Sequence, residues 1–526
     1  MTDFRAQQTE PSLSRLHFGL FLAAAGAFLY LRTFLLPATP FAATDDQSLF
    51  FARAVRIVQG QIPYRDFFEI VTPGTDLIYA VGFRLFGVHS WIMPMWTIVT
   101  GLAFSLLITY IAAQIVRGPS VWLPALLFLV FDFNSALDLT HQWFSTFAAL
   151  AMAAVLMGGL SVRRIFSAGL LCAVAILFTQ TKGMLVFVGV ILYLIGVTKP
   201  RGGDTSLGKR LALFILPAVL MVTCALGYYV YKSGFRPVLF DLVIFPLRFL
   251  PLSEVNTPRT YIHELAQLSN FHRPSEIAFL IPAFFIYALV PYAYVAGLYQ
   301  LRRRRGVLSR TLQRNLILLH VVGLGLFLAI ANGPRHFRLC TVAPPAILIF
   351  VWLLTLPIPA LGYIRKLSWV LAGCYFILLP VYRQVQWHDK LDLPIGRTAF
   401  TDRALFQKFQ WVSERTHPWD GFFNDSALIL YLSLHNPTQT EFVTYDETTR
   451  PEQIAAVVQA LKRNPPAYIS LLPATPGFTA GGDHAAPFRQ FVYDNYSVAK
   501  VFSQKQSQYE QELWRRSTLS AMGLVR

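Results

Sequence analysis

The chain reads Thr44-Asp45-Asp46-Gln47-Ser48-Leu49-Phe50-Phe51-Ala52-Arg53 directly after its first long apolar segment, and it continues at Tyr64-Arg65-Asp66-Phe67-Phe68-Glu69. Acidic side chains at the edge of the hydrocarbon core of a membrane are costly unless they are solvated, paired or functional. Arginines lie between the acids of the two stretches. We therefore predict that the loop 37–90 lies on a membrane surface and holds the residues of a reactive site.

Composition supports the membrane assignment. The 526-residue chain is 55% hydrophobic, and only 14% of its residues are charged. Its mean hydropathy is +0.48, whereas a soluble domain carries about 25% charged residues. The net charge of +17 lies largely in short loops between apolar segments, which is typical of the positive-inside rule. The charge therefore does not indicate a nucleic-acid partner.

Apolar segments long enough to approach the roughly 20 residues of a membrane-spanning helix recur along the first 386 residues. We predict eleven spans at 16–36, 91–116, 120–134, 142–160, 165–181, 183–198, 211–231, 276–299, 315–331, 340–359 and 367–386. Lysines and arginines are concentrated in alternate loops, most strongly at Arg302–Arg305. This alternation predicts a cytoplasmic N-terminus in the inner (plasma) membrane and places 37–90, 232–275 and the chain after 387 on the outer, periplasmic side.

The predicted fold class is a polytopic α-helical membrane protein with a small α/β domain at its C-terminus. The membrane domain covers 1–386, and its loop 37–90 contains two helices on the membrane surface. The first begins at Thr44 or Asp45 and ends at Gly60, and the second covers 75–86 and ends at Gly87. After residue 387, turn residues separate alternating helices and strands, including a strand near 441–445, which predicts an extracytoplasmic α/β domain over 387–526.

The order of these features resembles the GT-C superfamily of membrane glycosyltransferases. The nearest group is the RgtA/B/C/D-like one, related to the protein O-mannosyltransferases and the lipid A aminoarabinose transferase. The resemblance rests on Asp45-Asp46, Arg53, Gly60, the run Pro63–Glu69 and Pro73-Gly74, with weaker support from 141–145, 333–338 and Pro344-Pro345. It covers about 16–386. Many relatives have Lys-Pro-Pro near the end of this loop, where the present chain has Thr72-Pro73-Gly74 and no lysine.

The resemblance implies a sugar donor linked to a polyprenyl phosphate. The sugar would be transferred on the outer face to a lipid, polysaccharide or protein hydroxyl, usually with inversion. Such a transfer needs a base for the acceptor hydroxyl, and we expect Asp45 or Asp46 to supply it. Either residue could instead cap the following helix. Asp66 and Glu69 are expected to hold donor or acceptor, or only to pair with Arg65.

The leaving lipid phosphate needs fixed positive charge. Arg335, His336 and Arg338 lie on the predicted outer side, against the trend of the other basic residues, and are candidates for this role. Contact with lipid headgroups is the alternative. Lys182 in the turn Gln180-Thr181-Lys182-Gly183 is a second candidate, unless it extends to the membrane interface. His141 could bind donor or acceptor, or be a structural histidine at a helix start.

No sequence motif predicts a resident cofactor. His263, Glu264 and His272 lack the tight spacing of a metal site, although Asp45, Asp46, Asp66 and Glu69 could hold a divalent cation. A transporter or flippase of lipid-linked saccharide is the main alternative function. A transporter should have ionisable residues near the middle of the membrane, and the predicted spans contain almost no ionisable residues there. A membrane scaffold would not need acids and arginines on several outer loops.

Overall fold

A computed structural model describes the fold. The residues that it describes are 15–44, 46–197, 206–252, 256–267, 274–443, 449–471, 483–503 and 510–517. The chain forms two compact units. Unit 1 consists of Met1–Thr33, Trp96–Val222 and Pro258–Val385, and unit 2 of Phe34–Met95, Thr223–Thr257 and Gln386–Arg526. Unit 2 thus combines two outer loops predicted from sequence with the C-terminal region. The predicted domain boundary between residues 386 and 387 stays a prediction.

Helices make up the described part of unit 1. They are α1 (Arg15–Thr33), α4 (Ile92–Ala113, which begins in unit 2), α5 (Leu123–Leu127), the turns η2 (Phe128–Asp132) and η3 (Phe133–Ala136), α6 (His141–Met157), α7 (Val162–Phe178), α8 (Gln180–Val197), α9 (Leu207–Ser233, which ends in unit 2), α12 (Arg259–Gln267), α13 (Pro274–Arg303), α14 (Arg310–Ala329), α15 (His336–Cys340), α16 (Pro344–Leu354) and α17 (Pro359–Val385). Each of the eleven predicted spans coincides with helical residues of this set. Among the described residues, α1, α4, α9, α13, α14 and α17 are long and apolar enough to cross a membrane.

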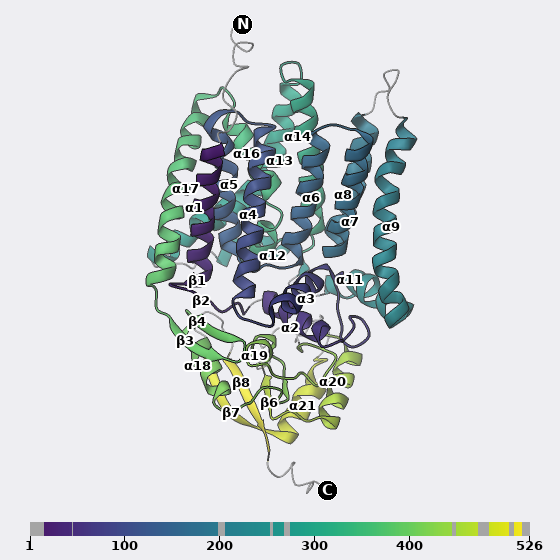
Figure 1. The fold of residues 1–526 in the computed structure, drawn as a ribbon, viewed down its shortest axis with the longest axis vertical. Coiled ribbons are helices and arrows are strands. Elements are labelled where there is room, and N and C mark those ends of the chain that lie inside the picture. The colour runs from purple at the N-terminus through teal and green to yellow at the C-terminus, as the bar shows by residue number, and fades with distance from the viewer. Residues whose placement is uncertain are drawn as a thin grey trace. The chain divides into compact units, whose positions relative to one another are not determined.

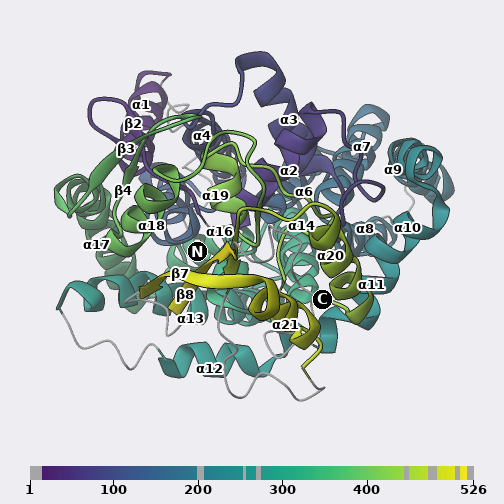
Figure 2. The same ribbon diagram turned by 90° about the horizontal axis from the view of Figure 1, so that it is seen from below.

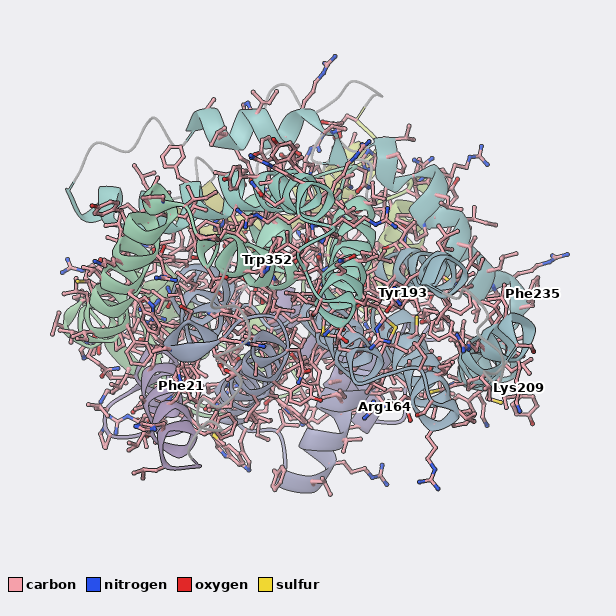
Figure 3. All side chains as sticks on the ribbon, turned by 90° about the horizontal axis from the view of Figure 1, so that it is seen from above. Phe21, Arg164, Tyr193, Lys209, Phe235 and Trp352 are labelled. Atoms are coloured by element: carbon pink, nitrogen blue, oxygen red, sulfur yellow. The ribbon has the colours of Figure 1, made fainter. Side chains whose placement is uncertain are left out.

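Helix α16 is the most deeply packed helix of unit 1. It contacts α5, α13, α14 and α17, and Leu348 and Val351 have no exposed surface. Trp352 of α16 lies among the helices, whereas Lys209 of α9 lies at the periphery (Figure 3). Helices α6, α7 and α8 contact one another and run side by side (Figure 1). A helix that is apolar on every side is stable only when neighbours or lipid surround it.

The loop after α1 forms the two short helices predicted from sequence. After the strand pair β1 (Phe34–Leu35) and β2 (Thr39–Pro40) come α2 (Asp46–Val58) and α3 (Gly74–Phe86). Gly60 and Gly87 follow them with φ of +91° and +81°, a backbone region that favours glycine. The rings of Phe51 and Tyr79 stack with centroids 4.1 Å apart. This apolar contact joins α2 to α3.

The second outer loop adds short helical turns to unit 2. These are α10 (Phe235–Leu239), η4 (Phe240–Ile244), α11 (Phe245–Arg248) and η5 (Leu250–Leu252). Val238 and Leu242 form a buried cluster with Tyr229 and with Tyr64 of the first loop. The Ser233 hydroxyl donates a hydrogen bond of 2.9 Å to the Pro63 carbonyl. The two outer loops are therefore packed together within unit 2.

The C-terminal region is a small α/β fold, as predicted. It contains the hairpin β3 (Asp389–Leu393) and β4 (Gly396–Phe400), α18 (Arg403–Ser413), β5 (Phe422–Phe423), α19 (Ser426–Tyr431), α20 (Pro451–Arg463), β6 (Tyr468–Leu471), α21 (Ala486–Asn495), β7 (Tyr496–Ser503) and β8 (Glu510–Arg516). The sheet order is β5-β6-β8-β7, with β5 and β6 parallel. Figure 2 shows β7 beside β8, and α21 leads into β7.

Two differences from the predicted elements stand out in this region. The strand predicted near 441–445 is not formed by 441–443, and 444–448 lie outside the described residues. The hairpin β3–β4 was not predicted. Its Ala399 forms a bridge with Phe41 of the first outer loop, and the Ala42 N–H donates to the Ala399 carbonyl over 2.8 Å. The bridge could not be predicted, because its two residues lie more than 350 positions apart in the chain and leave no local sequence signal.

Candidate functional site

The N-terminal end of α2 holds one of the two predicted bases. Asp46 is the first residue of α2, and its side chain is exposed to solvent. Asp45 lies outside the described residues. The first turn of a helix presents backbone N–H groups and the positive end of the helix dipole, which stabilises a carboxylate there. The position of Asp46 suits both the catalytic and the capping interpretation of the acid pair.

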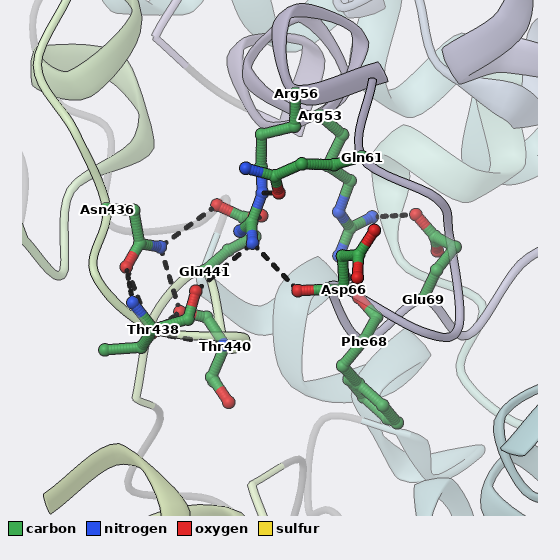
Figure 4. A network of polar contacts seen from close by, with 10 residues as sticks. All are labelled: Arg53, Arg56, Gln61, Asp66, Phe68, Glu69, Asn436, Thr438, Thr440 and Glu441. Atoms are coloured by element: carbon green, nitrogen blue, oxygen red, sulfur yellow. Dashed lines mark hydrogen bonds and ion pairs between the residues drawn. The ribbon is translucent and has the colours of Figure 1, made fainter. Parts of the chain in front are cut away.

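A buried ion pair lies on the inner face of α2. Arg53 contacts the carboxylate of Glu69, and the exposed fractions of the two residues are 7% and 0%. Glu69 also accepts a hydrogen bond of 3.0 Å from the Val71 N–H. Burial raises the pKa of Glu69, and the neighbouring Arg53 guanidinium opposes that rise. Glu69 therefore pairs with Arg53 and not with Arg65, and it fixes the loop 62–71 against α2 (Figure 4).

Two further acids surround this ion pair. Asp241 of η4 accepts a hydrogen bond of 3.4 Å from the Glu69 N–H, and burial raises the pKa of Asp241 to about 8. Asp76 of α3 is fully buried. Burial first, and the negative charge of Glu69 second, raise the pKa of Asp76 well above its usual range. With one guanidinium among three carboxyl groups, burial favours the protonated form of Asp241 at neutral pH and shifts Asp76 in the same direction.

Arg56, one helical turn after Arg53, joins three segments of unit 2. It forms an ion pair of 2.6 Å with Glu441 and a hydrogen bond of 2.6 Å to the Gln61 side chain. It also donates to the carbonyls of Asp66 (3.0 Å) and Thr438 (3.2 Å). Figure 4 shows this guanidinium between α2, the loop 61–69 and the segment 436–441. The planar guanidinium group of Arg56 can donate hydrogen bonds to several acceptors at once.

Asp66 and Arg65 form a pair at the surface. Their side chains lie 2.8 Å apart and are partly exposed. Asp66 also accepts a hydrogen bond of 2.7 Å from the Ile62 N–H. The hydrogen bond from Arg65 lowers the pKa of Asp66. The pairing of Asp66 with Arg65, which was one of the alternatives for this residue, is present in the structure, and Asp66 also closes the turn 62–66.

Lys182 lies at the centre of a polar cluster in unit 1. Its side chain is 1% exposed, and its ammonium group donates to the Thr341 hydroxyl over 2.8 Å and to the Gln142 carbonyl over 3.4 Å. A side chain at Gly183 would collide with the Ile176 backbone, so the glycine allows α8 to approach α7 closely. Lys182 therefore points into the unit.

Thr341 connects Lys182 to two other predicted segments. Its hydroxyl donates to the Arg338 carbonyl over 2.8 Å, and its Oγ1 lies 3.0 Å from the Gln142 side-chain oxygen. The adjacent His141 begins α6, and its Nδ1 lies 2.8 Å from the Thr179 hydroxyl. The predicted residues Lys182, Arg338 and His141 thus come from three helices that meet within unit 1.

Arg335 and His336 share a carboxylate. Glu264 of α12 accepts from the Arg335 side chain (2.6 Å), from the His336 N–H (2.8 Å) and from the Tyr287 hydroxyl (2.7 Å). Burial acts to raise the pKa of Glu264, but the hydrogen bond from Arg335 and the others outweigh it, so that this pKa is lowered. Burial lowers the pKa of His336. Glu264 is therefore a structural partner of the turn 335–341.

Comparison with known proteins places the fold. A scan of the sequence against protein-family models finds no match, and a search among curated proteins finds none. The solved structure of ArnT from Cupriavidus metallidurans bound to undecaprenyl phosphate matches with a TM-score of 0.60 and 12% identity, over 95% of this chain and 98% of that chain. ArnT in the apo state matches with a TM-score of 0.58 and 13% identity, over 97% and 99%. The chain has the fold of these two ArnT structures, in agreement with the predicted fold class.

A third solved structure matches more weakly than the two ArnT structures. The archaeal oligosaccharyltransferase AglB from Archaeoglobus fulgidus, solved with an inhibitory peptide and a dolichol-phosphate, is 10% identical with a TM-score of 0.49, over 87% of this chain and 70% of that chain. The ArnT-like fold and the six long apolar helices found among the described residues agree with the predicted class of multi-pass membrane protein.

Several residues of the polar clusters in the two units were not predicted as site residues. In unit 2 they are Arg53, Arg56, Asp76 and Asp241, and in unit 1 Gln142, Glu264 and Thr341. Asp76 and Asp241 are single acids inside apolar runs, and this isolation is the signal that could have found them. No comparable signal in the sequence marks Thr341. Its hydrogen bond with Lys182 forms only because α8 and the turn 335–341 lie side by side in the fold.

Proposed function

We propose that the protein is a glycosyltransferase that moves a sugar from a polyprenyl-phosphate-linked donor to a lipid, polysaccharide or protein hydroxyl. The observation that carries this proposal is the match to ArnT over nearly the full length of both chains. ArnT was solved with undecaprenyl phosphate, a lipid phosphate of the class that the proposed donor would leave behind. The proposed site of action is the outer face of the inner membrane.

The proposed reaction is a displacement at the anomeric carbon of the sugar. The acceptor oxygen forms a new bond to this carbon, the bond from the carbon to the phosphate oxygen breaks, and the configuration inverts. The acceptor proton passes to a carboxylate, for which we propose Asp45 or Asp46. The bonding electrons leave with the polyprenyl phosphate, so the phosphate gains negative charge. A positioned base contributes about 10²–10⁴-fold to such a step.

Stabilisation of the leaving phosphate is assigned to the cations of unit 1. Lys182 is buried and held by Thr341 and Gln142, so its ammonium group would need little rearrangement to meet an anion. Arg338 lies on the adjoining turn, and Arg335 and His336 precede it. Binding of donor or acceptor by Asp66, Glu69, Arg65 and His141 stays a prediction from sequence.

The proposed mechanism includes no metal step. Among the residues that the structure describes, no three His, Cys, Asp or Glu side chains are placed to hold a metal ion. Burial raises the pKa of Asp76 and of Asp241, and Glu69 is paired with Arg53, which makes these three carboxyl groups poorer ligands in this arrangement. The carboxylates and cations of the chain itself supply the proposed charges.

The first test is sugar transfer by the purified protein in detergent. The reaction contains a panel of polyprenyl-phosphate sugars and a membrane-lipid extract as acceptor. Wild type is compared with Asp45→Asn, Asp46→Asn and, as a matched control, Asp392→Asn, an exposed acid of β3. We expect one of the first two variants to lose about 10²–10⁴-fold in rate at an unchanged melting temperature, and the control to keep full activity.

Two other outcomes would reassign the function. Equal transfer by wild type and both loop variants would place the base elsewhere in the chain. If no donor is consumed while lipid-linked saccharide crosses liposomes that contain the protein, the transporter interpretation replaces the enzyme.

Lys182 has its own test. Lys182→Met keeps the length of the side chain but removes its charge, and we expect it to lower transfer at least about tenfold. Lys209→Met, which changes an exposed lysine of α9, should leave transfer unchanged. Equal loss in both variants would contradict a specific role for Lys182.

A further inference from the structure

A pocket within unit 2 is not used by the proposed reaction. It has a volume of about 390 Å³ and lies between α2 and the segment 418–441. Val55 and Arg56 of α2 and Gln59 directly after it line one side of the pocket, and Trp419, His435 and Glu441 line the opposite side. Its volume falls within the roughly 300–1,000 Å³ typical of small-molecule sites. It is large enough for a compact polar ligand.

The charges that line the pocket compensate each other. The Arg56 guanidinium is paired with Glu441 at 2.6 Å, and the Asn436 side-chain amide lies 3.4 Å from the same carboxylate. Asn436 is itself fixed by the Thr438 N–H at 2.9 Å and the Thr440 carbonyl at 3.0 Å. These groups form a rigid array of donors and acceptors without net charge (Figure 4). Such an array suits neutral hydroxyl groups better than a phosphate or a carboxylate.

Trp419 presents a large aromatic surface at this pocket. Its exposed fraction is 65%, although its backbone adopts a left-handed conformation with φ of +75°. The Trp419 N–H donates to the Ser433 carbonyl over 2.8 Å, and Ser433 is also left-handed, with φ of +53°. Non-glycine residues adopt this conformation reluctantly, and such strain clusters at functional sites. The chain thus holds an exposed indole next to the polar array.

We propose that this pocket binds a neutral saccharide. The C–H face of a pyranose ring packs on an indole, while its hydroxyls exchange hydrogen bonds with amide, carboxylate and imidazole groups. Trp419 supplies the aromatic surface, and Gln59, His435 and Glu441 supply hydrogen-bonding groups around it. The inference goes beyond the proposed function, because a sugar would bind here even if the protein transferred none.

The test is direct binding to the full-length purified protein. The probes are methyl pyranosides of glucose, galactose, mannose and N-acetylglucosamine, with glucose 1-phosphate as the anionic comparison. The detergent must have no sugar headgroup, because a maltoside would compete. Saturation-transfer NMR identifies the bound sugar protons, and titration gives the dissociation constant. We expect at least one neutral pyranoside to bind, and glucose 1-phosphate to bind more weakly.

The variants locate the site. Trp419→Ala should weaken binding of that pyranoside at least tenfold, and Gln59→Ala, at an exposed residue directly after α2, should weaken it at least threefold. Tyr493→Ala removes a half-exposed aromatic ring of α21 outside the pocket and should leave binding unchanged. Absence of binding by every pyranoside, tighter binding of glucose 1-phosphate, or unchanged binding in both pocket variants would overturn the proposal. Loss of sugar transfer alone bears only on the proposed function.

Discussion

Asn424 shows how a single residue in unit 2 combines backbone and side-chain roles. Its φ is +76°, its side-chain amide donates to the Ser470 carbonyl over 2.7 Å, and its side-chain oxygen accepts from the Val443 N–H over 2.6 Å. Asn424→Ala loses both hydrogen bonds and strains the backbone, and we expect it to lower the free energy of unfolding by about 3 kcal/mol. Asn424→Gly loses only the bonds.

The difference between these two variants isolates the backbone conformation. Asn424→Gly should be the more stable of the two by about 1 kcal/mol, measured as the melting temperature in detergent. An alanine variant as stable as the glycine variant would show that the left-handed conformation carries no cost at this position.

Asp241 gives unit 2 a defined pH dependence. Its pKa is about 8 in the folded protein against an ordinary value of 3.8. Between about pH 4 and 8 the folded protein therefore retains a proton that the unfolded chain has released. The stabilisation is complete below about pH 4 and lost as the pH rises to 8, with a slope of up to about 1.4 kcal/mol per pH unit.

Substitution by asparagine tests this dependence. Asp241→Asn removes the titrating group and should flatten the fall in unfolding free energy between pH 5 and 8, measured by denaturant titration at each pH. Asp392→Asn, at an exposed acid, should leave the slope as in wild type. A wild-type slope in Asp241→Asn would assign the titration to another group.

Residues of the candidate site could be predicted only in part. Arg338 was predicted because it opposes the general charge trend on the predicted outer side, Lys182 because of its turn, and His141 because of its place at a helix start. The structure brings the three residues to one region of unit 1. The partners of Glu69 and Arg56 could not be predicted. Whether Glu69 pairs with Arg53 or with Arg65 depends on the geometry of the turn between them, which the sequence does not give. Glu441 lies 385 residues from Arg56.

The helices α2 and α3 pack against each other within the outer loop. Phe51 is fully buried and contacts both Tyr79 and Phe83, with ring centroids 4.1 and 5.4 Å away. Phe51→Ala would leave a cavity between the helices, and we expect it to lower the free energy of unfolding by about 3–5 kcal/mol.

The matched change on α3 is Leu85→Ala. Leu85 is 70% exposed, so its truncation should alter stability by no more than about 0.5 kcal/mol. Both variants are compared by melting temperature in the same detergent. Equal effects would mean that the exposed face of α3 contributes as much as the packed one.

Helices were the most predictable elements of this chain. Apolar length and glycine endings located α1, α2, α3 and the long helices, because these signals are local. The strands were less predictable. The pairing of β7 with β8 and the bridge from Ala399 to Phe41 depend on which segments meet in space, and short strands carry little intrinsic preference.

Orientation in the membrane is a property of the whole molecule. The basic run Arg302–Arg305 covers the last turn of α13 and the start of the loop before α14. This run predicts a cytoplasmic position, whereas the C-terminus is predicted to be periplasmic. Alkaline phosphatase folds only in an oxidising compartment. A fusion of this enzyme after Arg526 should be active in a bacterial host, and a fusion after Gly306 should be inactive. The reverse pattern would invert the proposed topology.

The Arg56–Glu441 ion pair also sets an order of events during synthesis of the protein. Its partners lie 385 residues apart, and a similar distance separates Ala43 from Tyr431, whose hydroxyl accepts the Ala43 N–H. At about 5–20 residues per second, translation from the first partner to the second takes about 20–80 s. During that interval the nascent first loop lacks its final neighbours, and α2 holds an arginine without its carboxylate. Completion of unit 2 must therefore wait until the ribosome has delivered the last membrane helix and the segment behind it.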